Sequence, residues 1–227
     1  KNLSWEMSGL NNQNFLGNIY LTGINSTFLK KKIGKNKFSL SKNLISPVIS
    51  KDNIIFSDDR GTIFSINKKG KIIWKKNIYK KLYKKIYKIL SFAIYKDYVF
   101  VSDNIGFIYK LNIRDGKTIW IKNHSIPIKS NIKLFEEKIY LINQDNRLLC
   151  LNVNDGSMLW SSQSIRSFIK TQNLLSIAIS KEKDLVILNS SGDLVKLKSS
   201  TGQIHWTLSA LGSFYAHDAD FFKSSKI

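Results

Sequence analysis

Apolar residues along the chain fall into short runs of four to seven residues, rich in Ile, Val, Leu, Phe and Tyr and bounded by Asp, Asn, Gly or Lys. Runs of this length with these boundaries predict β-strands rather than helices. The runs recur in sets of four, and the sets are aligned by the similar segments 61–67, 106–112, 146–152 and 192–198. Each set predicts a four-stranded antiparallel meander.

One motif recurs in every set, a glycine followed four residues later by a tryptophan. The four instances are Gly70 and Trp74, Gly116 and Trp120, Gly156 and Trp160, and Gly202 and Trp206. The tryptophans are 46, 40 and 46 residues apart, which is the length of four short strands with their turns. Glycine suits these hairpin loops because it accepts a positive φ. We expect the tryptophans to pack between adjacent units as core residues rather than to form a ligand platform.

Repeated four-stranded sheets of 40 to 46 residues predict an all-β fold, a β-propeller whose blades are these sheets. A β-sandwich is the alternative, although nothing in a sandwich demands the recurring motif. The expected complete blades span residues 46–76, 90–122, 130–161 and 175–208. Residues 1–45 form an N-terminal segment with a candidate closing outer strand at 26–33, and residues 209–227 begin a further blade. About four blades predict a partial ring, an arc of a longer chain.

The residues around two of the motifs carry a family resemblance. The segments 112–120 and 152–160, each with a strand end, an Asp-Gly turn and a tryptophan, resemble the PQQ-like, quinoprotein-type β-propeller repeat. Within that group the chain is most similar to the family of the outer-membrane assembly factor BamB, through Trp5, the segments 9–12 and 16–19, and residues 144–152 and 160–165. The resemblance implies an eight-bladed ring of which this chain carries about half.

The same resemblance implies a function. It points to a non-catalytic scaffold at the periplasmic face of the outer membrane, with a subunit of the barrel assembly machinery as its protein partner. The chain departs from the family in having no N-terminal cysteine for lipid attachment and in its net charge of +20. Because it begins at Lys1 without Met or an apolar leader, we expect that the true start has been removed.

The charge alone suggests a nucleic acid or an anionic membrane as partner. Only four of the 36 basic residues are Arg, however, and a nucleic-acid surface normally uses Arg for bidentate contacts. We therefore expect no nucleic-acid partner and attribute most of the excess to composition. Ten of the lysines lie between Lys68 and Lys88. The apolar spacing from 78 to 90 fits an amphipathic basic helix, so residues 75–90 are a candidate contact with an anionic membrane surface; the alternative is a plain connector between blades.

Catalytic chemistry has little support in the sequence. The alternative function is a quinone (PQQ)-dependent dehydrogenase fragment that lacks its cofactor site, because such enzymes share the repeat. The single Cys150 excludes a vicinal disulfide and is expected to be a strand residue. Several acids are expected to be turn residues, namely Asp58, Asp103, Asp115 and Asp155. The group His217, Asp218 and Asp220 is a weak metal candidate. We expect no enzyme activity, no catalytic residue, no metal and no cofactor.

Partner binding is assigned to one connector. Residues 162–173 contain Ile165, Arg166 and Phe168, which combine apolar side chains with a scarce arginine. Arg and large apolar residues are common anchors of protein interfaces. These three residues are the candidate partner-binding site, and the alternative is a loop packed on its own blade.

Overall fold

The computed structural model describes residues 4–17, 27, 29–34, 46–50, 52–166 and 173–209. Its strands form four antiparallel sheets of four strands each, in simple sequence order. The first two sheets are β1 (Val48–Ile49), β2 (Ile54–Ser57), β3 (Thr62–Ile66) and β4 (Ile72–Asn77), then β5 (Leu90–Tyr95), β6 (Tyr98–Asp103), β7 (Phe107–Asn112) and β8 (Thr118–Asn123). The last two are β9 (Lys133–Phe135), β10 (Lys138–Ile142), β11 (Arg147–Asn152) and β12 (Met158–Gln163), then β13 (Ser176–Ile179), β14 (Asp184–Leu188), β15 (Asp193–Lys198) and β16 (Ile204–Ser209).

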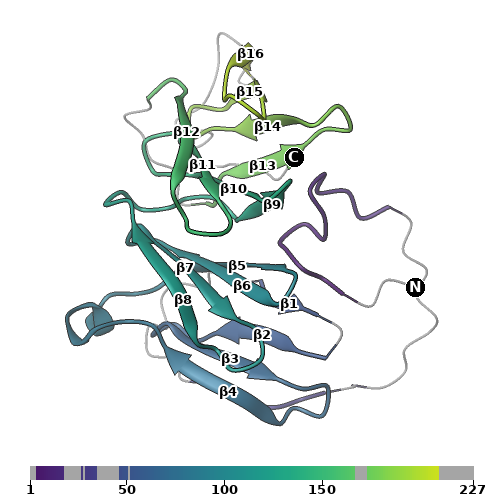
Figure 1. Ribbon diagram of the computed structural model, residues 1–227, viewed down its shortest axis with the longest axis vertical. Coiled ribbons are helices and arrows are strands. Elements are labelled where there is room, and N and C mark those ends of the chain that lie inside the picture. The colour runs from purple at the N-terminus through teal and green to yellow at the C-terminus, as the bar shows by residue number, and fades with distance from the viewer. Residues whose placement is uncertain are drawn as a thin grey trace.

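The sheets are arranged as successive blades of a propeller arc (Figure 1). The first strands converge, because β1 lies beside β5 and β5 beside β9. The fourth strands, β4, β8, β12 and β16, form the outer edge and pair on one side only within the described residues. The expected fold class, an all-β partial propeller with four-stranded antiparallel blades, is confirmed.

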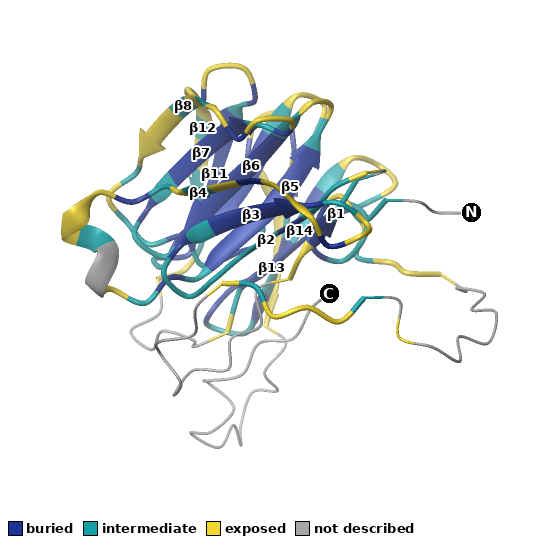
Figure 2. Ribbon diagram, turned by 90° about the horizontal axis from the view of Figure 1, so that it is seen from below, coloured by how far each residue is buried: buried dark blue, intermediate teal, exposed yellow. Residues whose placement is uncertain are grey.

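The core lies between the blades. Three clusters of buried side chains join the first blade to the second, the second to the third and the third to the fourth. The central strands β6, β7, β10 and β11 are therefore covered on both sheet faces and are buried at nearly every position (Figure 2). Burial on both faces explains why these strands read as continuous apolar runs rather than alternating ones.

Every blade carries the same irregularity on its outer strand. In the second blade Lys110 pairs with Trp120, but the next residue, Leu111, pairs with Thr118, so Ile119 is an extra, bulged residue. The register shifts at the same place in the other three blades, where the bulged residues are Ile73, Leu159 and His205. A bulge bends and twists an edge strand, which opposes backbone hydrogen bonding of that edge to a strand of another sheet.

The N-terminal residues run across the inner strands of all four blades. Trp5 pairs with Ile49 of β1, and the amide of Ile94 in β5 donates to the Glu6 carbonyl at 2.7 Å. Farther along, the amide of Ile179 in β13 donates to the Asn12 carbonyl at 2.8 Å. In Figure 1 this segment lies beside the inner ends of the blades. It therefore provides hydrogen-bond partners for inner strands that are more than 120 residues apart.

The connector between the first two blades differs from the expected amphipathic helix, and that prediction is wrong. It contains one short 3₁₀ helix, η1 (Lys81–Lys85), with extended residues on both sides. The four-residue spacing does not form one apolar helix face, because Leu82 and Ile86 are exposed while Lys88, expected on the polar side, is buried. No helix among the described residues is long and apolar enough to cross a bilayer.

Two expected elements fall partly or wholly outside the described residues. Within 26–33 the structure describes residues 27 and 29–33, which lie outside the named strands. Leu29 and Lys31 nevertheless pack against Gly70, and the Lys31 ammonium donates to the Gly70 carbonyl at 2.8 Å. Residues 210–227, including His217, Asp218 and Asp220, lie outside the described residues.

Candidate functional site

The tryptophan of one blade contacts the glycine turn of the next. A Cβ atom on Gly116 would lie 2.7 Å from the Trp74 ring, and the Trp74 indole N–H donates to the Ile113 carbonyl in the same turn at 2.8 Å. Trp120 repeats both contacts on the third blade, with Gly156 and the Val153 carbonyl. The glycines adopt φ near +70°, a conformation that other residues resist.

The last two tryptophans depart from this pattern. Trp160 packs on Gly202, but its indole nitrogen is buried without a hydrogen-bond partner, and the Tyr140 hydroxyl donates to the Ser199 carbonyl in the corresponding turn at 3.2 Å. Trp206 is 44% exposed. Trp74, by comparison, is 8% exposed. The outer face of β16 is therefore the one place in the described arc where the motif tryptophan is not covered by a following turn.

The turn between the second and third strands of each blade is closed by an Asp or Asn side chain. The carboxylate of Asp103 accepts the amides of Ile105, Gly106 and Phe107 at 2.8 to 2.9 Å. Asp58, Asn143 and Asn189 occupy the same position and accept amides two and four residues ahead. Asp115 and Asp155 each accept an amide two residues ahead in the following turn. The expectation that these acids serve turns is confirmed.

The candidate partner-binding residues lie on the connector after β12. Ile165 is 64% exposed and Arg166 is exposed, whereas Phe168 lies outside the described residues. The backbone before them is held on its own blade. Ser164 donates from its amide and its hydroxyl to the Asn146 carbonyl, the hydroxyl at 2.9 Å, and the Gln163 side-chain amide donates to the Asp145 carbonyl at 2.8 Å. The connector thus combines a fixed backbone with exposed side chains.

Asn146 organises this connector and was not singled out by the sequence. It is fully buried, and its side-chain amide donates to the Ile165 carbonyl at 2.9 Å. Its side-chain oxygen accepts both the amide and the hydroxyl of Ser190 in the fourth blade, at 3.1 and 2.7 Å. Asn146 also has a φ of +59°, which asparagine tolerates better than most residues. The sequence signal for it is that Asn146 stands where the other three blades have a glycine with positive φ, namely Gly61, Gly106 and Gly192.

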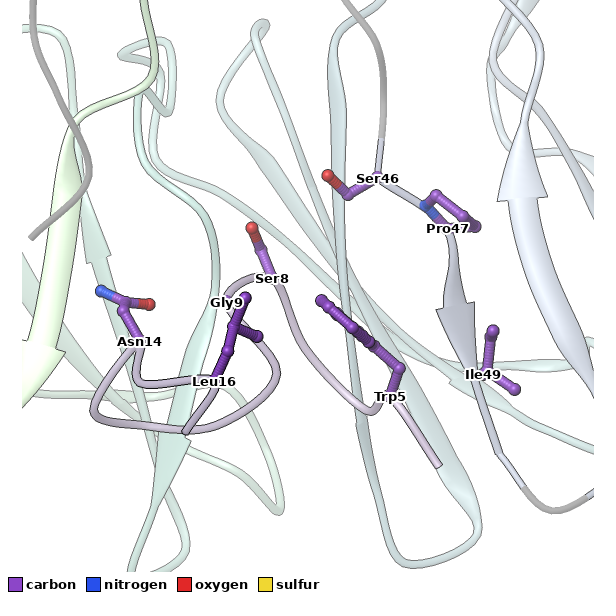
Figure 3. Close-up of a pocket in the computed structure, with 8 residues that line it drawn as sticks. All are labelled: Trp5, Ser8, Gly9, Asn14, Leu16, Ser46, Pro47 and Ile49. Carbon is purple, nitrogen blue, oxygen red and sulfur yellow. The ribbon is translucent and has the colours of Figure 1, made fainter. Parts of the chain in front are cut away.

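A pocket of about 460 Å³ lies where the N-terminal segment meets the first blade. Figure 3 shows the Trp5 side chain between those of Leu16 and Pro47. The remaining lining residues are Ser8, Gly9, Asn14, Ser46 and Ile49. None of the described residues that line this pocket is charged, so this part of the lining is suited to apolar groups.

The segment beside this pocket is anchored by a buried lysine. Lys133 of β9 is 2% exposed, and its ammonium donates to the carbonyls of Ser8 and Asn11 and to the side-chain oxygen of Asn14, at 2.9, 2.7 and 2.6 Å. Three oxygen partners compensate the cost of burying the charge. The ammonium fixes the path of the segment between its contacts with β5 and β13.

The groups with catalytic potential are engaged in structure or separated. Cys150 is buried in β11, as expected, and desolvation raises the pKa of its thiol to about 11. His124 lies in a connector, where burial and then Lys122 lower its pKa, and His205 lies 3.7 Å from the Asp184 carboxylate. No group of three His, Cys, Asp or Glu side chains suited to a metal occurs among the described residues.

The sheets, the glycine-tryptophan contacts and the converging inner strands define a β-propeller protein with PQQ-like repeats. The chain belongs to the family of the outer membrane protein assembly factor BamB, whose model matches residues 59–223. The sequence itself matches no curated protein.

Solved structures with similar folds include BamB from Moraxella catarrhalis, with a TM-score of 0.58 and 15% identity over 72% of this chain and 47% of that one. Quinohemoprotein alcohol dehydrogenase from Comamonas testosteroni has a TM-score of 0.60 and 15% identity over 73% of this chain and 34% of that one. The corresponding enzyme from Pseudomonas putida HK5 has a TM-score of 0.59, with 12% identity. This chain spans about half of that BamB and about a third of these dehydrogenases.

Proposed function

We propose that the protein is a non-catalytic scaffold of the outer-membrane β-barrel assembly machinery. In this proposal it acts at the periplasmic face of the outer membrane, as part of a lipid-anchored protein, and binds partner proteins through blade loops and outer strands. Membership of the BamB family supports the proposal. The observation that carries it is the connector after β12, where Asn146 holds the backbone and leaves Ile165 and Arg166 exposed.

This geometry favours protein binding for an energetic reason. A loop that is already ordered loses less conformational entropy when a partner binds it, so more of the contact energy contributes to affinity. Exposed apolar and arginine side chains next to each other supply the anchor types that dominate protein interfaces. The outer strands offer a second contact, since their bulged residues Ile73, Ile119 and Leu159 are each 46 to 51% exposed.

The test is co-purification of the full-length, lipidated protein with the barrel subunit. The double variant Ile165→Asp with Arg166→Glu is expected to bind at least about tenfold more weakly, as for loss of an interface anchor. Arg114→Glu is the matched control, because Arg114 is an exposed arginine on a turn at the opposite end of the blades. Unchanged binding of the double variant would remove this connector from the site, and no co-purification of the wild type would overturn the scaffold function.

The dehydrogenases of similar fold define the alternative function. No group of three His, Cys, Asp or Glu side chains suited to a metal occurs among the described residues, and Asp58, Asp103, Asp115 and Asp155 accept amides of their own turns. These observations support the scaffold rather than the enzyme. Quinone-dependent oxidation of an alcohol by the purified full-length protein, measured with a dye acceptor after addition of PQQ and Ca²⁺, would favour the enzyme over the scaffold.

A further inference from the structure

The connector between the first and second blades, residues 78–89, has a rigid base. The Tyr79 hydroxyl donates to the buried Asp103 carboxylate at 2.7 Å, and the Lys88 ammonium lies 4.6 Å from the centre of the Tyr79 ring. Lys88 is fully buried and donates to the carbonyls of Tyr83 and Ile86. The Tyr79 hydrogen bond ties the start of the connector to the second blade, and Lys88 closes the connector on itself.

The second blade holds the end of the connector as well. The Asn104 side chain accepts the Ile89 amide at 3.0 Å and donates to the Tyr87 carbonyl at 3.1 Å. The ring of Tyr83 packs edge-on against Phe107, with ring centres 5.7 Å apart. The short helix η1 therefore projects from a fixed support, as the coiled ribbon in Figure 1 shows.

The tip of this connector combines apolar exposure with positive charge. Leu82 is 79% exposed, more than any other large apolar side chain described, and Ile86 is 47% exposed. Lys80 and Lys81 beside them are exposed too. Within the described part of the chain neither lysine forms an ion pair. At the base of the connector, the Asp59 main-chain carbonyl accepts the Lys88 amide and the Asp103 carboxylate accepts the Tyr79 hydroxyl.

We propose that this tip docks on an anionic lipid surface, with Leu82 and Ile86 entering the interface and the lysines contacting lipid headgroups. Exposed Leu82 lies beside lysines that form no ion pair with the described residues, and this combination favours a lipid surface over a nucleic acid as the partner. A nucleic acid offers phosphates but no apolar layer to receive Leu82. A membrane offers both, and lysine is well suited to a headgroup region because it contributes charge without needing bidentate geometry. The site is independent of the connector after β12.

The experiment is co-sedimentation of the protein with vesicles of phosphatidylcholine containing about one-third phosphatidylglycerol, at low salt and again at about 0.5 M salt. Wild-type protein is expected to bind, and binding is expected to weaken with salt. Leu82→Ser is expected to weaken binding roughly tenfold, from the transfer energy of a leucine side chain. The double variant Lys80→Gln with Lys81→Gln is expected to weaken it roughly 25-fold, at about fivefold per lysine.

The matched control is the double variant Lys68→Gln with Lys69→Gln. It removes the same charge from an exposed turn of the first blade, at the opposite end of its strands from the connector. The proposal requires that this control bind like the wild type. If both double variants lost vesicle binding equally, the binding would depend on net charge alone, and the proposed docking site would be overturned.

The Leu82→Ser variant provides a second test of the proposal. Because its side chain is already exposed, Leu82→Ser is expected to leave the urea midpoint of unfolding unchanged, so lost binding cannot be attributed to lost folding. Unchanged vesicle binding of Leu82→Ser would overturn the proposal. So would binding of duplex DNA that depends on Lys80 and Lys81 but not on Leu82, because it would identify the tip as a polyanion site.

Discussion

At Gly116 the first and second blades approach so closely that there is no room for a Cβ atom. The Trp74 ring lies where a side chain at Gly116 would begin, and the φ of +70° is itself costly for any other residue. The hydrogen bond from the Trp74 indole to the Ile113 carbonyl depends on the same close approach of the two blades. One residue type thus satisfies both a backbone and a packing requirement.

We expect Gly116→Ala to lower the free energy of unfolding by about 3 kcal/mol, from overpacking added to left-handed strain. Gly17→Ala is the control, because Gly17 has a φ of +61° but only an ordinary contact of 3.6 Å with Phe15. That variant should lose about 1 kcal/mol from strain alone. Urea unfolding followed by tryptophan fluorescence measures both. Equal losses would mean that the contact with Trp74 contributes nothing.

At the scale of an element, the turn after β6 carries a buried acid. Desolvation raises the pKa of Asp103, although Tyr79 and three amides oppose the shift. An acid with a raised pKa in the folded state contributes most stability below its ordinary pKa of 3.8 and loses that contribution as the pH rises through the folded value. Asn143 and Asn189 close the equivalent turns without a charge.

Asp103→Asn is therefore expected to keep the turn and to flatten the pH dependence. Stability measured at about pH 4 and at about pH 7 should fall in the wild type, because Asp103 ionises as the pH rises, and should fall less in the variant. Urea unfolding at both pH values measures the difference, with Asp58→Asn in the equivalent turn of the first blade as control. The same pH dependence in Asp103→Asn and the wild type would contradict the assignment.

The N-terminal segment is the element that depends most on one side chain. We expect Lys133→Met, which preserves most of the side-chain length, to cost about 2 kcal/mol through the loss of charged hydrogen bonds. Hydrogen exchange provides the specific readout, because the amides of Ile94 and Ile179 donate to this segment and should exchange faster. Lys138→Met on the neighbouring strand β10 is the control. Unaltered exchange at both amides would show that Lys133 does not hold the segment.

At the scale of the whole molecule, the arc is directional, because Trp74, Trp120 and Trp160 each pack on the glycine turn of the blade that follows. Trp74→Ala is expected to cost about 4 kcal/mol, as for other buried tryptophans. Trp206→Ala should cost less than about 1 kcal/mol in the 227-residue chain, because Trp206 is 44% exposed. Urea unfolding of the two variants tests the difference. Comparable losses would mean that the face of β16 is covered in solution.

The fold was predictable because its information is local and repeated. The same glycine-to-tryptophan spacing marks the same turn and outer strand in all four blades. Asp115 and Asp155 form hydrogen bonds within their own turns. The site was less predictable because its residues act over long separations. Lys133 contacts residues more than 115 positions away, and Asn146 joins positions 165 and 190. In the connector after β4, the periodicity that predicts a helix combines buried Tyr79 with exposed Leu82 and Ile86, which share no helix face.

The crossing of the inner strands by residues 4–14 also has a consequence in time. Asn12 is made long before Ile179, the strand residue whose amide it accepts. At ordinary rates of translation the interval is roughly 10 to 30 s. During that interval the first blades can form between neighbours, but the segment that ties the first blade to the fourth cannot complete its contacts. We expect closure of the inner face to be a late step of biosynthesis, set by the ribosome rather than by the speed of strand pairing.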